Sequence, residues 1–379
     1  MSFRSICAVS GVRAWGMKEG KYGLALIEAH GTAAGVFTQN LARAAPVELM
    51  RKQIKAGKLE AVVANSGCAN AYTGKRGYAD AVIMTEYAGS ALGIKPSRIG
   101  VASTGVIGRY LDLPLIKKQC EAVAPRLART PEAEDLAEKA IMTTDLIPKH
   151  ALVHKEGFTI GGMIAPNMGT MLAFIYTDAE VGAKPLADAL RKATRRSFNR
   201  VVVDGDTSTN DIALCTATGE AGKVKAGEFA AALEECCRSL AEQIAQDGEG
   251  ATKLLQVTVT GAKKEEVAEK VARTVIGSPL VKTAVYGEDP NWGRVVAAAG
   301  RAGVKFDPNA VSLWISDGNG RFPLVKSGEI IADLALAKKA MHGKKVIFIL
   351  DLATGKAGAT AWGCDLTEKY VEINGKYTT

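Results

Sequence analysis

The sequence predicts a mixed α and β protein of the α+β class, and three observations lead there. Short apolar runs typical of strands alternate with longer segments whose apolar residues recur every three or four positions. The 379 residues are 47% hydrophobic and 23% charged, which is ordinary for a chain that buries a substantial core. Many of the 40 glycines lie in polar clusters, as in Asp317-Gly-Asn-Gly320, and indicate turns between short elements.

The first half of the chain alternates between the two patterns. Residues 59–64 and 170–177 are rich in Ala, Val, Leu, Ile and Phe, which suits buried strands. His150 and His154 are four residues apart, but the sequence around them indicates a strand and a turn rather than a helix with two metal ligands. We expect strands at 24–28, 59–64 and 170–177, and helices at 78–92, 114–128 and 185–197.

The second half contains one long amphipathic helix, predicted over 227–246 and ending near Gly248. Its apolar face consists of Phe229, Ala232, Leu233, Cys236, Leu240 and Ile244. We also expect strands at 201–203, 255–260, 312–315 and 346–350, with helices at 264–276 and 331–341. No fixed-period repeat or low-complexity linker marks a domain boundary.

Charge and cysteine content argue for a cytoplasmic protein that does not bind nucleic acid or a membrane. The net charge is +8, but Lys and Arg are spread along the chain, and such a surface also suits an enzyme for carboxylated small molecules. The seven cysteines form no C-x-x-C pair, as expected for reduced thiols. No apolar stretch reaches the roughly 20 residues of a membrane span, and no signal peptide is visible.

The Gly169-Thr170 pair is the strongest candidate for chemistry. It follows Pro166 and precedes an apolar run. A threonine hydroxyl needs a base, and cleavage of the Gly169-Thr170 bond would create one, because the new α-amine has a pKa of about 7.7 to 8. Gly169 permits the unusual backbone geometry that self-cleavage favours. From this segment alone, the start of a buried strand is the more common interpretation.

The run Asp204-Gly-Asp-Thr-Ser-Thr-Asn-Asp211 resembles the start of a calcium loop. An EF-hand requires glycine at its sixth position and a glutamate at its twelfth, which here are Thr209 and Cys215. We therefore interpret it as a turn with structural carboxylates, and we expect no metal.

Seven blocks in sequence order resemble the ornithine acetyltransferase family of arginine biosynthesis, the bifunctional glutamate N-acetyltransferases. The blocks are Asn65-Ser-Gly-Cys-Ala-Asn70, Ser103-Thr-Gly-Val-Ile-Gly108, Ile141-Met-Thr-Thr-Asp145, Met163-Ile-Ala-Pro-Asn-Met-Gly-Thr-Met-Leu172, Val203-Asp-Gly-Asp-Thr-Ser-Thr-Asn-Asp211, Asp247-Gly-Glu-Gly-Ala-Thr-Lys253 and Asp289-Pro-Asn-Trp-Gly-Arg294. The resemblance implies a layered α/β fold similar to that of the self-processing aminopeptidases.

The resemblance also implies a cleavage and an activity. Cleavage between Gly169 and Thr170 would give an α chain of residues 1–169 and a β chain of residues 170–379, assembled as an α2β2 heterotetramer. Thr170 would accept the acetyl group of N2-acetylornithine and pass it to glutamate. No cofactor is implied, although some members use acetyl-CoA as a co-substrate.

Site residues follow from the same resemblance. Thr104 and Gly105 would form the oxyanion hole, and the nucleophile Thr170 would itself contact substrate. The other implied substrate contacts are Thr143, Glu249, Asn374 and Thr379, which implies an ordered C-terminal tail.

One departure from the family pattern concerns a substrate-binding lysine that the family carries eleven residues before the nucleophile. Counting back from Thr170 gives Thr159, in a segment that is shorter than in the family. Lys149 or Lys155 could supply the charge. Two alternatives to the transferase therefore stay open, a hydrolase of the same fold with water as acceptor, and an uncleaved inactive protein.

Overall fold

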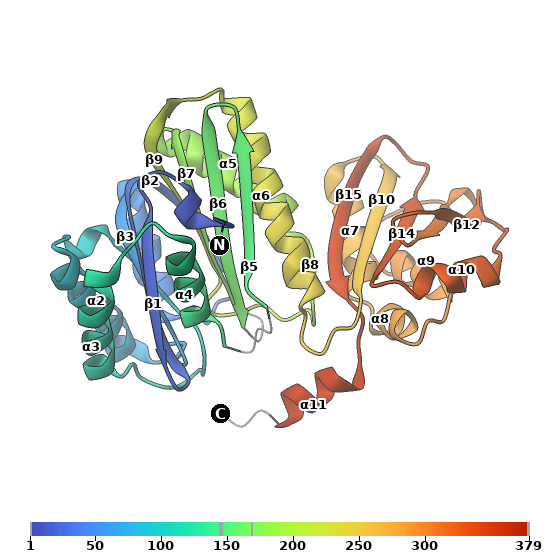
Figure 1. Ribbon diagram of the computed structural model, residues 1–379. Helices are drawn as coiled ribbons and strands as arrows, with labels where there is room; N and C mark the ends of the chain where they lie inside the picture. The colour runs from blue at the N-terminus through green and yellow to red at the C-terminus, as the bar shows by residue number, and fades with distance from the viewer. Residues whose placement is uncertain (1, 144–146, 168–169, 377–379) are drawn as a thin grey trace. The chain divides into compact units, whose positions relative to one another are not determined.

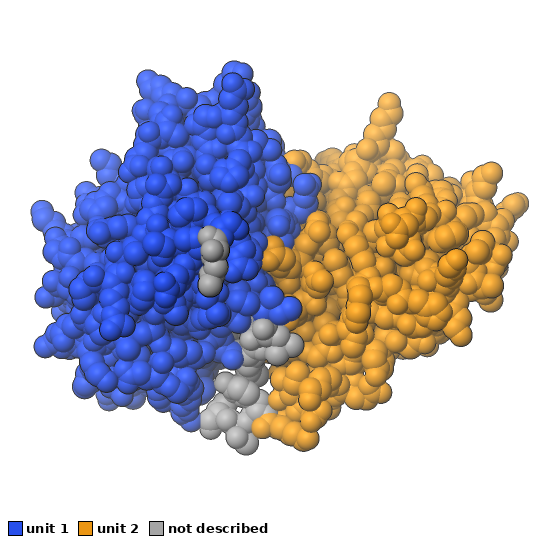
Figure 2. Space-filling model, viewed as in Figure 1, with its two compact units in different colours: residues 1–195, 206–240 blue, residues 196–205, 241–379 orange. Residues whose placement is uncertain are grey.

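The structure is a computed structural model that describes residues 2–143, 147–167 and 170–376 (Figure 1). The chain divides into two compact units (Figure 2). Unit 1 consists of Met1–Arg195 and Asp206–Leu240, and unit 2 of Arg196–Gly205 and Ala241–Thr379. Each described unit combines a sheet with helices, and the predicted α+β class is confirmed.

Unit 1 is built on one sheet with the strand order β4-β3-β2-β9-β7-β6-β5, and β1 pairs with β2. Its strands are β1 (Arg13–Glu19), β2 (Tyr22–Phe37), β3 (Lys58–Ser66), β4 (Ile99–Ser103), β5 (Lys149–Lys155), β6 (Phe158–Asn167), β7 (Thr170–Glu180) and β9 (Ile212–Lys223). Strand β2 joins the two halves of the sheet, since Gly23 to Thr32 pair with β3 and Thr32 to Phe37 pair with β9. Strand β7 is buried along nearly its whole length because the sequence supplies apolar residues for both faces.

The helices of unit 1 cover this sheet. They are α1 (Ala45–Gln53), α2 (Gly74–Leu92), α3 (Leu113–Val123), α4 (Pro131–Ile141), α5 (Ala183–Arg196) and α6 (Ala226–Gln246), with α6 continuing into unit 2. The predicted helix over 114–128 ends earlier, at Val123, and a 3₁₀ turn follows because Pro125 has no N–H to continue the helix. Helix α6 packs on β6 at Gly162, where an added Cβ would lie 2.9 Å from Leu240.

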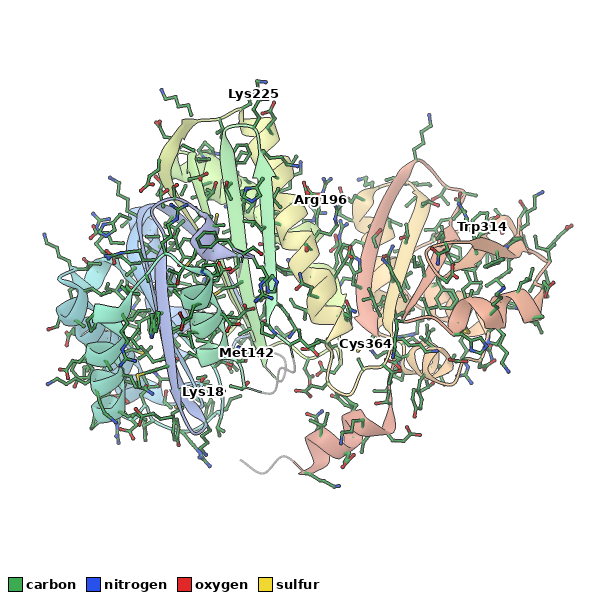
Figure 3. The ribbon with its side chains drawn as sticks, viewed as in Figure 1. Lys18, Met142, Arg196, Lys225, Trp314 and Cys364 are labelled. Atoms are coloured by element: carbon green, nitrogen blue, oxygen red, sulfur yellow. The ribbon has the colours of Figure 1, made fainter. Side chains whose placement is uncertain are left out.

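Helix α4 is fixed at both ends. Thr130 caps its first turn by accepting a hydrogen bond from the Ala133 N–H, and Pro131 occupies the first turn. At the other end, Lys18 on β1 donates to the Met142 carbonyl oxygen at 2.5 Å (Figure 3). These contacts hold the residues that precede Thr143.

Unit 2 contains a second sheet with the strand order β13-β12-β11-β14-β10-β15-β8. Its strands are β8 (Val201–Val202), β10 (Leu254–Ala262), β11 (Ser312–Ser316), β12 (Arg321–Lys326), β13 (Glu329–Ile330), β14 (Lys345–Asp351) and β15 (Ala357–Cys364), and its helices are α7 (Glu265–Ile276), α8 (Pro279–Tyr286), α9 (Trp292–Gly300), α10 (Leu334–Met341) and α11 (Glu368–Lys376). Helix α7 buries Ala268, Val271 and Val275 in the core of this unit. Helix α10 begins at Leu334, later than predicted, because Asp333 caps the N–H groups of Ala335 and Leu336.

The two compact units do not follow the division into residues 1–169 and 170–379. Strands β6 and β7 lie on either side of position 170 and pair antiparallel within one sheet, from Ile160 opposite Thr177 to Asn167 opposite Thr170. The division into α and β chains stays a prediction. If it occurs, these strand pairings keep the two fragments together.

Candidate active site

Thr170 is the first residue of β7 and lies opposite Asn167 of β6. It is buried, and its hydroxyl lies 2.8 Å from the Ser208 hydroxyl. Met168 and Gly169, and with them the predicted cleavage bond, lie outside the described residues. The structure thus places the candidate nucleophile at a strand end, within reach of a second hydroxyl.

Ser208 connects Thr170 to the carboxyl of Asp211. Asp211 accepts a hydrogen bond from the Met171 N–H at 2.8 Å and another from the Ser208 side chain. Either hydroxyl can be the donor between Thr170 and Ser208, and if the Ser208 proton points to Asp211, Thr170 donates its own proton to Ser208 Oγ. Burial raises the pKa of Asp211 to about 6, although these two hydrogen bonds favour its ionised form.

Asn210 ties the Ser208 loop to the predicted oxyanion turn. Its side-chain amide donates to the carbonyl oxygens of Ala69 at 2.7 Å and Ser103 at 2.8 Å. Its backbone N–H donates to Ser208 Oγ at 3.0 Å. One asparagine therefore brings together the end of β4, the loop after β3 and the partner of the Thr170 hydroxyl.

Thr104 and Gly105 form a turn directly after β4, in which Thr104 is buried and Gly105 is partly exposed. The Thr104 N–H donates to the Asn65 carbonyl oxygen at 3.0 Å, so this donor is already used. Among the described residues the Gly105 N–H has no acceptor. The Gly105 N–H is thus a donor that fits an oxyanion, and the role of the Thr104 hydroxyl stays a prediction.

Gly105 is held in a conformation that favours glycine. Its φ is +129°, and an added Cβ would lie 2.4 Å from the Gly67 carbonyl carbon and 2.5 Å from the Cys68 nitrogen. Both are backbone atoms that cannot swing aside. The turn is also bound to that loop by hydrogen bonds from the Ala69 N–H to Val106 and from the Gly108 N–H to Ala71, both at 3.0 Å.

We expect Gly105→Ala to lower the free energy of unfolding by at least about 2 kcal/mol, because it adds a backbone clash to conformational strain. Gly108→Ala is the matched control in the same turn, since its φ of +80° imposes strain but an added Cβ meets nothing within 4 Å. Chemical denaturation of both variants measures the difference. Equal losses would show that the close approach to Gly67 is unimportant.

The predicted substrate contacts fall into both units. Thr143 lies in unit 1, just after α4, and its buried hydroxyl has no partner among the described residues. Glu249 and Asn374 lie together in unit 2, where the Asn374 amide donates to Glu249 Oε2 at 2.8 Å. Glu249 Oε1 is buried without a partner among the described residues. Thr379 lies outside the described residues, so its role stays a prediction.

The position reached by counting back from Thr170 is not near Thr170. Thr159 lies near the opposite end of β6, opposite His154, and its N–H donates to Asp178 at 2.7 Å. Lys155 is at that same far end and pairs with Glu235 at 2.8 Å. Lys149 is buried opposite Ile164, toward the Thr170 end, and donates to the Ile147 carbonyl at 3.0 Å. Of the two lysines considered, Lys149 is the one on the nucleophile's side.

Ser208, Asn210 and Asp211 are site residues to which the sequence analysis assigned no chemistry. The available signal was the Asp204–Asp211 block itself, which was interpreted as a structural turn. Asp211 does accept a hydrogen bond from the backbone, as a structural carboxylate would. The donor is the N–H of Met171, the residue next to Thr170.

Other predictions concern metals, thiols and membranes. His150 and His154 both lie on strand β5, as the sequence indicated. Within the described residues, no group of three or more His, Cys, Asp or Glu side chains could hold a metal ion. All seven cysteines are buried thiols outside any disulfide. Over residues 2–143, 147–167 and 170–376, no helix is long and apolar enough to cross a bilayer.

An enzyme of the acyltransferase class requires a nucleophile, a group that accepts its proton and a donor for the oxyanion, and the site contains a candidate for each. Comparison with known proteins agrees with this class. The chain belongs to the ArgJ family, whose model matches residues 9–379. The resemblance drawn from the seven blocks is thereby confirmed.

Individual relatives match the chain over nearly its full length. It is 51% identical to the glutamate N-acetyltransferase of Methanosarcina mazei, over 99% of this chain and 98% of that protein. It is 45% identical to the arginine biosynthesis bifunctional protein ArgJ of Archaeoglobus fulgidus, over 99% of this chain and 100% of that protein. The crystal structure of the arginine biosynthesis bifunctional protein argJ from Bacillus halodurans is 39% identical and superposes with a TM-score of 0.52, covering 56% of this chain and 100% of that chain.

Proposed function

We propose that this protein transfers the acetyl group of N2-acetylornithine to glutamate in arginine biosynthesis, through an acetyl ester on Thr170 that forms after cleavage at Gly169-Thr170. Membership of the ArgJ family supports an acyltransferase of this pathway. The observation that carries the finer proposal is the hydrogen bond between the hydroxyls of Thr170 and Ser208 at the start of β7.

Self-cleavage needs a base before any α-amine exists. We assign this role to Asp211 acting through Ser208, since the hydrogen bonds run from Thr170 to Ser208 and from Ser208 to Asp211. Thr170 Oγ attacks the Gly169 carbonyl carbon, its proton moves to Ser208, and the Ser208 proton moves to Asp211. The C–N bond then breaks, the nitrogen takes up a proton, and water hydrolyses the resulting ester to leave Thr170 with a free α-amine.

The freed α-amine then serves as the base for acetyl transfer. It accepts the Thr170 hydroxyl proton while Oγ attacks the acetyl carbonyl of N2-acetylornithine, and the proton passes to the departing ornithine nitrogen. The glutamate amine reverses these steps on the acetyl ester. The Gly105 N–H and Thr104 hydroxyl stabilise both tetrahedral oxyanions, and losing one such donor costs about 10²-fold or more in rate.

The remaining substrate contacts suit amino-acid substrates. The unpartnered Oε1 of Glu249 can accept an ammonium group, and Asn374 holds the other oxygen of that carboxylate. We propose the same role in substrate binding for Thr143 and Thr379. We propose that the reaction needs no cofactor and that acetyl-CoA is an optional acetyl donor. We also propose that the enzyme is an α2β2 assembly in the cytoplasm.

A hydrolase is the second candidate, because one observation favours it. Strand β6 pairs with β5 and β7 from Phe158 to Asn167 and carries no lysine. A missing cationic contact to a substrate carboxylate weakens binding about tenfold or more, which favours water over glutamate as acceptor.

The two candidates differ in what glutamate does. Purified protein is incubated with N2-acetylornithine, with and without glutamate, and ornithine, acetate and N-acetylglutamate are quantified. We expect ornithine release to require glutamate and to match N-acetylglutamate mole for mole. Release of ornithine and acetate at the same rate in both reactions would replace the transferase with the hydrolase.

A further inference from the structure

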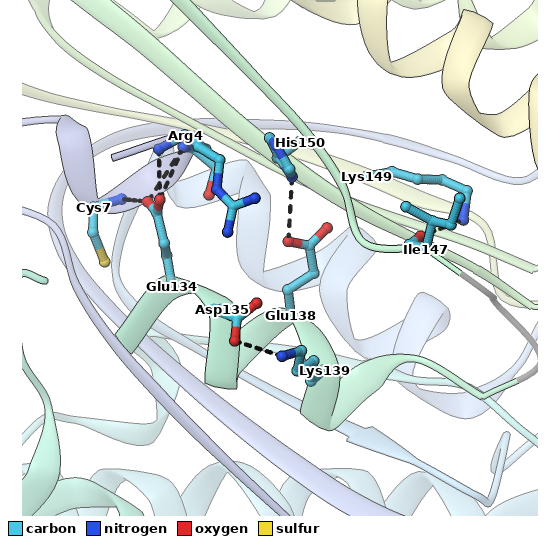
Figure 4. Close-up of polar contacts among 10 residues, drawn as sticks. Arg4, Cys7, Glu134, Asp135, Glu138, Lys139, Ile147, Lys149 and His150 are labelled. Carbon is cyan, nitrogen blue, oxygen red and sulfur yellow. Dashed lines mark hydrogen bonds and ion pairs between the residues drawn. The ribbon is translucent and has the colours of Figure 1, made fainter. Parts of the chain in front are cut away.

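A cavity of about 90 Å³ lies in unit 1, between the N-terminal segment, α4 and the start of β5 (Figure 4). Arg4 and Ser5 line it from the N-terminal segment, Glu134, Asp135 and Glu138 from α4, and His150 from β5. A single water needs roughly 10–15 Å³ by this kind of measure, so the cavity has room for a small organic molecule. None of these residues takes part in the proposed acetyl transfer.

Two of the three carboxylates in the cavity wall already have partners. Glu134 accepts hydrogen bonds from the N–H groups of Arg4 at 2.6 Å and Cys7 at 3.0 Å, which fixes the N-terminal turn against α4. Asp135 pairs with Lys139 at 2.7 Å, one helical turn away. Both pairings are structural, and one oxygen of the third carboxyl is left without a partner among the described residues.

Glu138 is that third carboxyl. Its residue is only 3% exposed, and its Oε1 has no hydrogen-bond partner among the described residues. Its Oε2 lies 3.9 Å from His150 Nδ1. The hydroxyl of Ser5, which is 1% exposed, is likewise without a partner in the described chain. Buried polar atoms of this kind are rare and costly, and both of these belong to residues of the cavity wall.

A cationic partner would change the protonation of Glu138. Burial raises its pKa to about 8, against the opposing effect of the Lys149 N–H and ammonium. An ammonium group placed beside Oε1 would favour the ionised form and form a charge-assisted hydrogen bond. Arg4 adds the opposite charge, since its guanidinium lies on the same side of α4 as Glu138 (Figure 4).

We propose that this cavity binds a small zwitterionic α-amino acid, with its ammonium group at Glu138 and Ser5 and its carboxylate at Arg4. The size of the cavity limits the ligand to a short side chain. The wall also includes Ile147 and Pro148, which follow the segment that begins with Thr143. A bound ligand would therefore connect α4 to β5. Thr143, a predicted substrate contact, lies between these two elements in the chain.

Glycine is the simplest probe, and isothermal titration calorimetry of the full chain measures its binding. We expect saturable binding with a Kd of about 1 mM or lower. Glu138→Gln and Arg4→Met should each weaken it at least about tenfold, because each removes one charged hydrogen bond. Arg126→Met is the matched control, since Arg126 is an exposed arginine elsewhere in unit 1, and it should leave the Kd unchanged.

Two half-ligands test the chemistry of the site. Methylamine carries only the cation and acetate only the anion, so each should bind at least about tenfold more weakly than glycine. Methylamine binding as tightly as glycine would overturn the proposal, as would no saturable glycine binding up to about 10 mM. If Glu138→Gln does not fold by circular dichroism, Arg4→Met and Ser5→Ala decide, and unchanged binding in both overturns it. The outcome does not depend on acetyl transfer.

Discussion

Thr170→Ala should remain a single uncleaved chain and should lose acetyl transfer. The substitution removes the oxygen that attacks the Gly169 carbonyl and later carries the acetyl group. The residues that follow Thr170 on β7, Met171 to Ile175, carry no hydroxyl that could replace it. Without the nucleophile, we expect the rate of acetyl transfer to fall by at least about 10³-fold. Intact mass spectrometry provides the direct measurement, because wild-type protein incubated with N2-acetylornithine alone should yield a fragment that begins at Thr170 and has gained one acetyl group.

Two further variants separate loss of chemistry from loss of fold. Thr170→Ser keeps a hydroxyl and should still be cleaved. Thr258→Ala is a matched control in unit 2, because Thr258 is also a strand threonine whose hydroxyl bonds another hydroxyl, that of Thr360 at 3.1 Å. It should be cleaved like the wild type. Cleavage of Thr170→Ala at position 169 would end the proposal that Thr170 cuts its own chain.

The sequence predicted most of the elements whose apolar pattern is strong. The helix over 227–246 and the strands that include 59–64 and 170–177 are present because their patterns are long and unbroken. Strand β9 was not predicted, since Ile212–Lys223 contains several Ala and Gly residues and ends in charged residues, all of which have weak strand preference. It nevertheless lies between β2 and β7, where its neighbours supply the burial.

Local sequence patterns also failed to predict how the residues of the candidate site are connected. Thr170, Thr104 and Gly105 were identified from motifs that are local in sequence. The hydrogen bond that relates them joins Asn210 to Ser103, residues 107 positions apart, and no local pattern encodes such a pairing. Counting eleven positions back from Thr170 likewise leads to Thr159 at the far end of β6, because the chain turns back in a hairpin between them.

Asp211→Asn should slow self-cleavage by about 10²- to 10⁴-fold, the range for removal of a general base. Ser208→Ala should act similarly, because it breaks the hydrogen-bonded connection between Thr170 and Asp211. The pH dependence gives the sharper test. Burial raises the pKa of Asp211 to about 6, so the carboxyl is protonated below that pH and cannot accept a proton. Cleavage of the wild-type precursor should therefore slow as the pH falls through about 6, and Asp211→Asn should lack this dependence.

Precursor protein is pulse-labelled by cell-free translation and transferred into buffers above and below pH 6. A denaturing gel then follows the cleavage rates of the wild type and of Asp211→Asn. Asp178→Asn is the matched control, because Asp178 is also a buried carboxyl that accepts a backbone N–H, that of Thr159 at 2.7 Å, but lies at the other end of β7. It should cleave at the wild-type rate. An Asp211→Asn precursor that cleaves as fast as this control would mean that Asp211 only holds the Met171 N–H and that another group accepts the Thr170 proton.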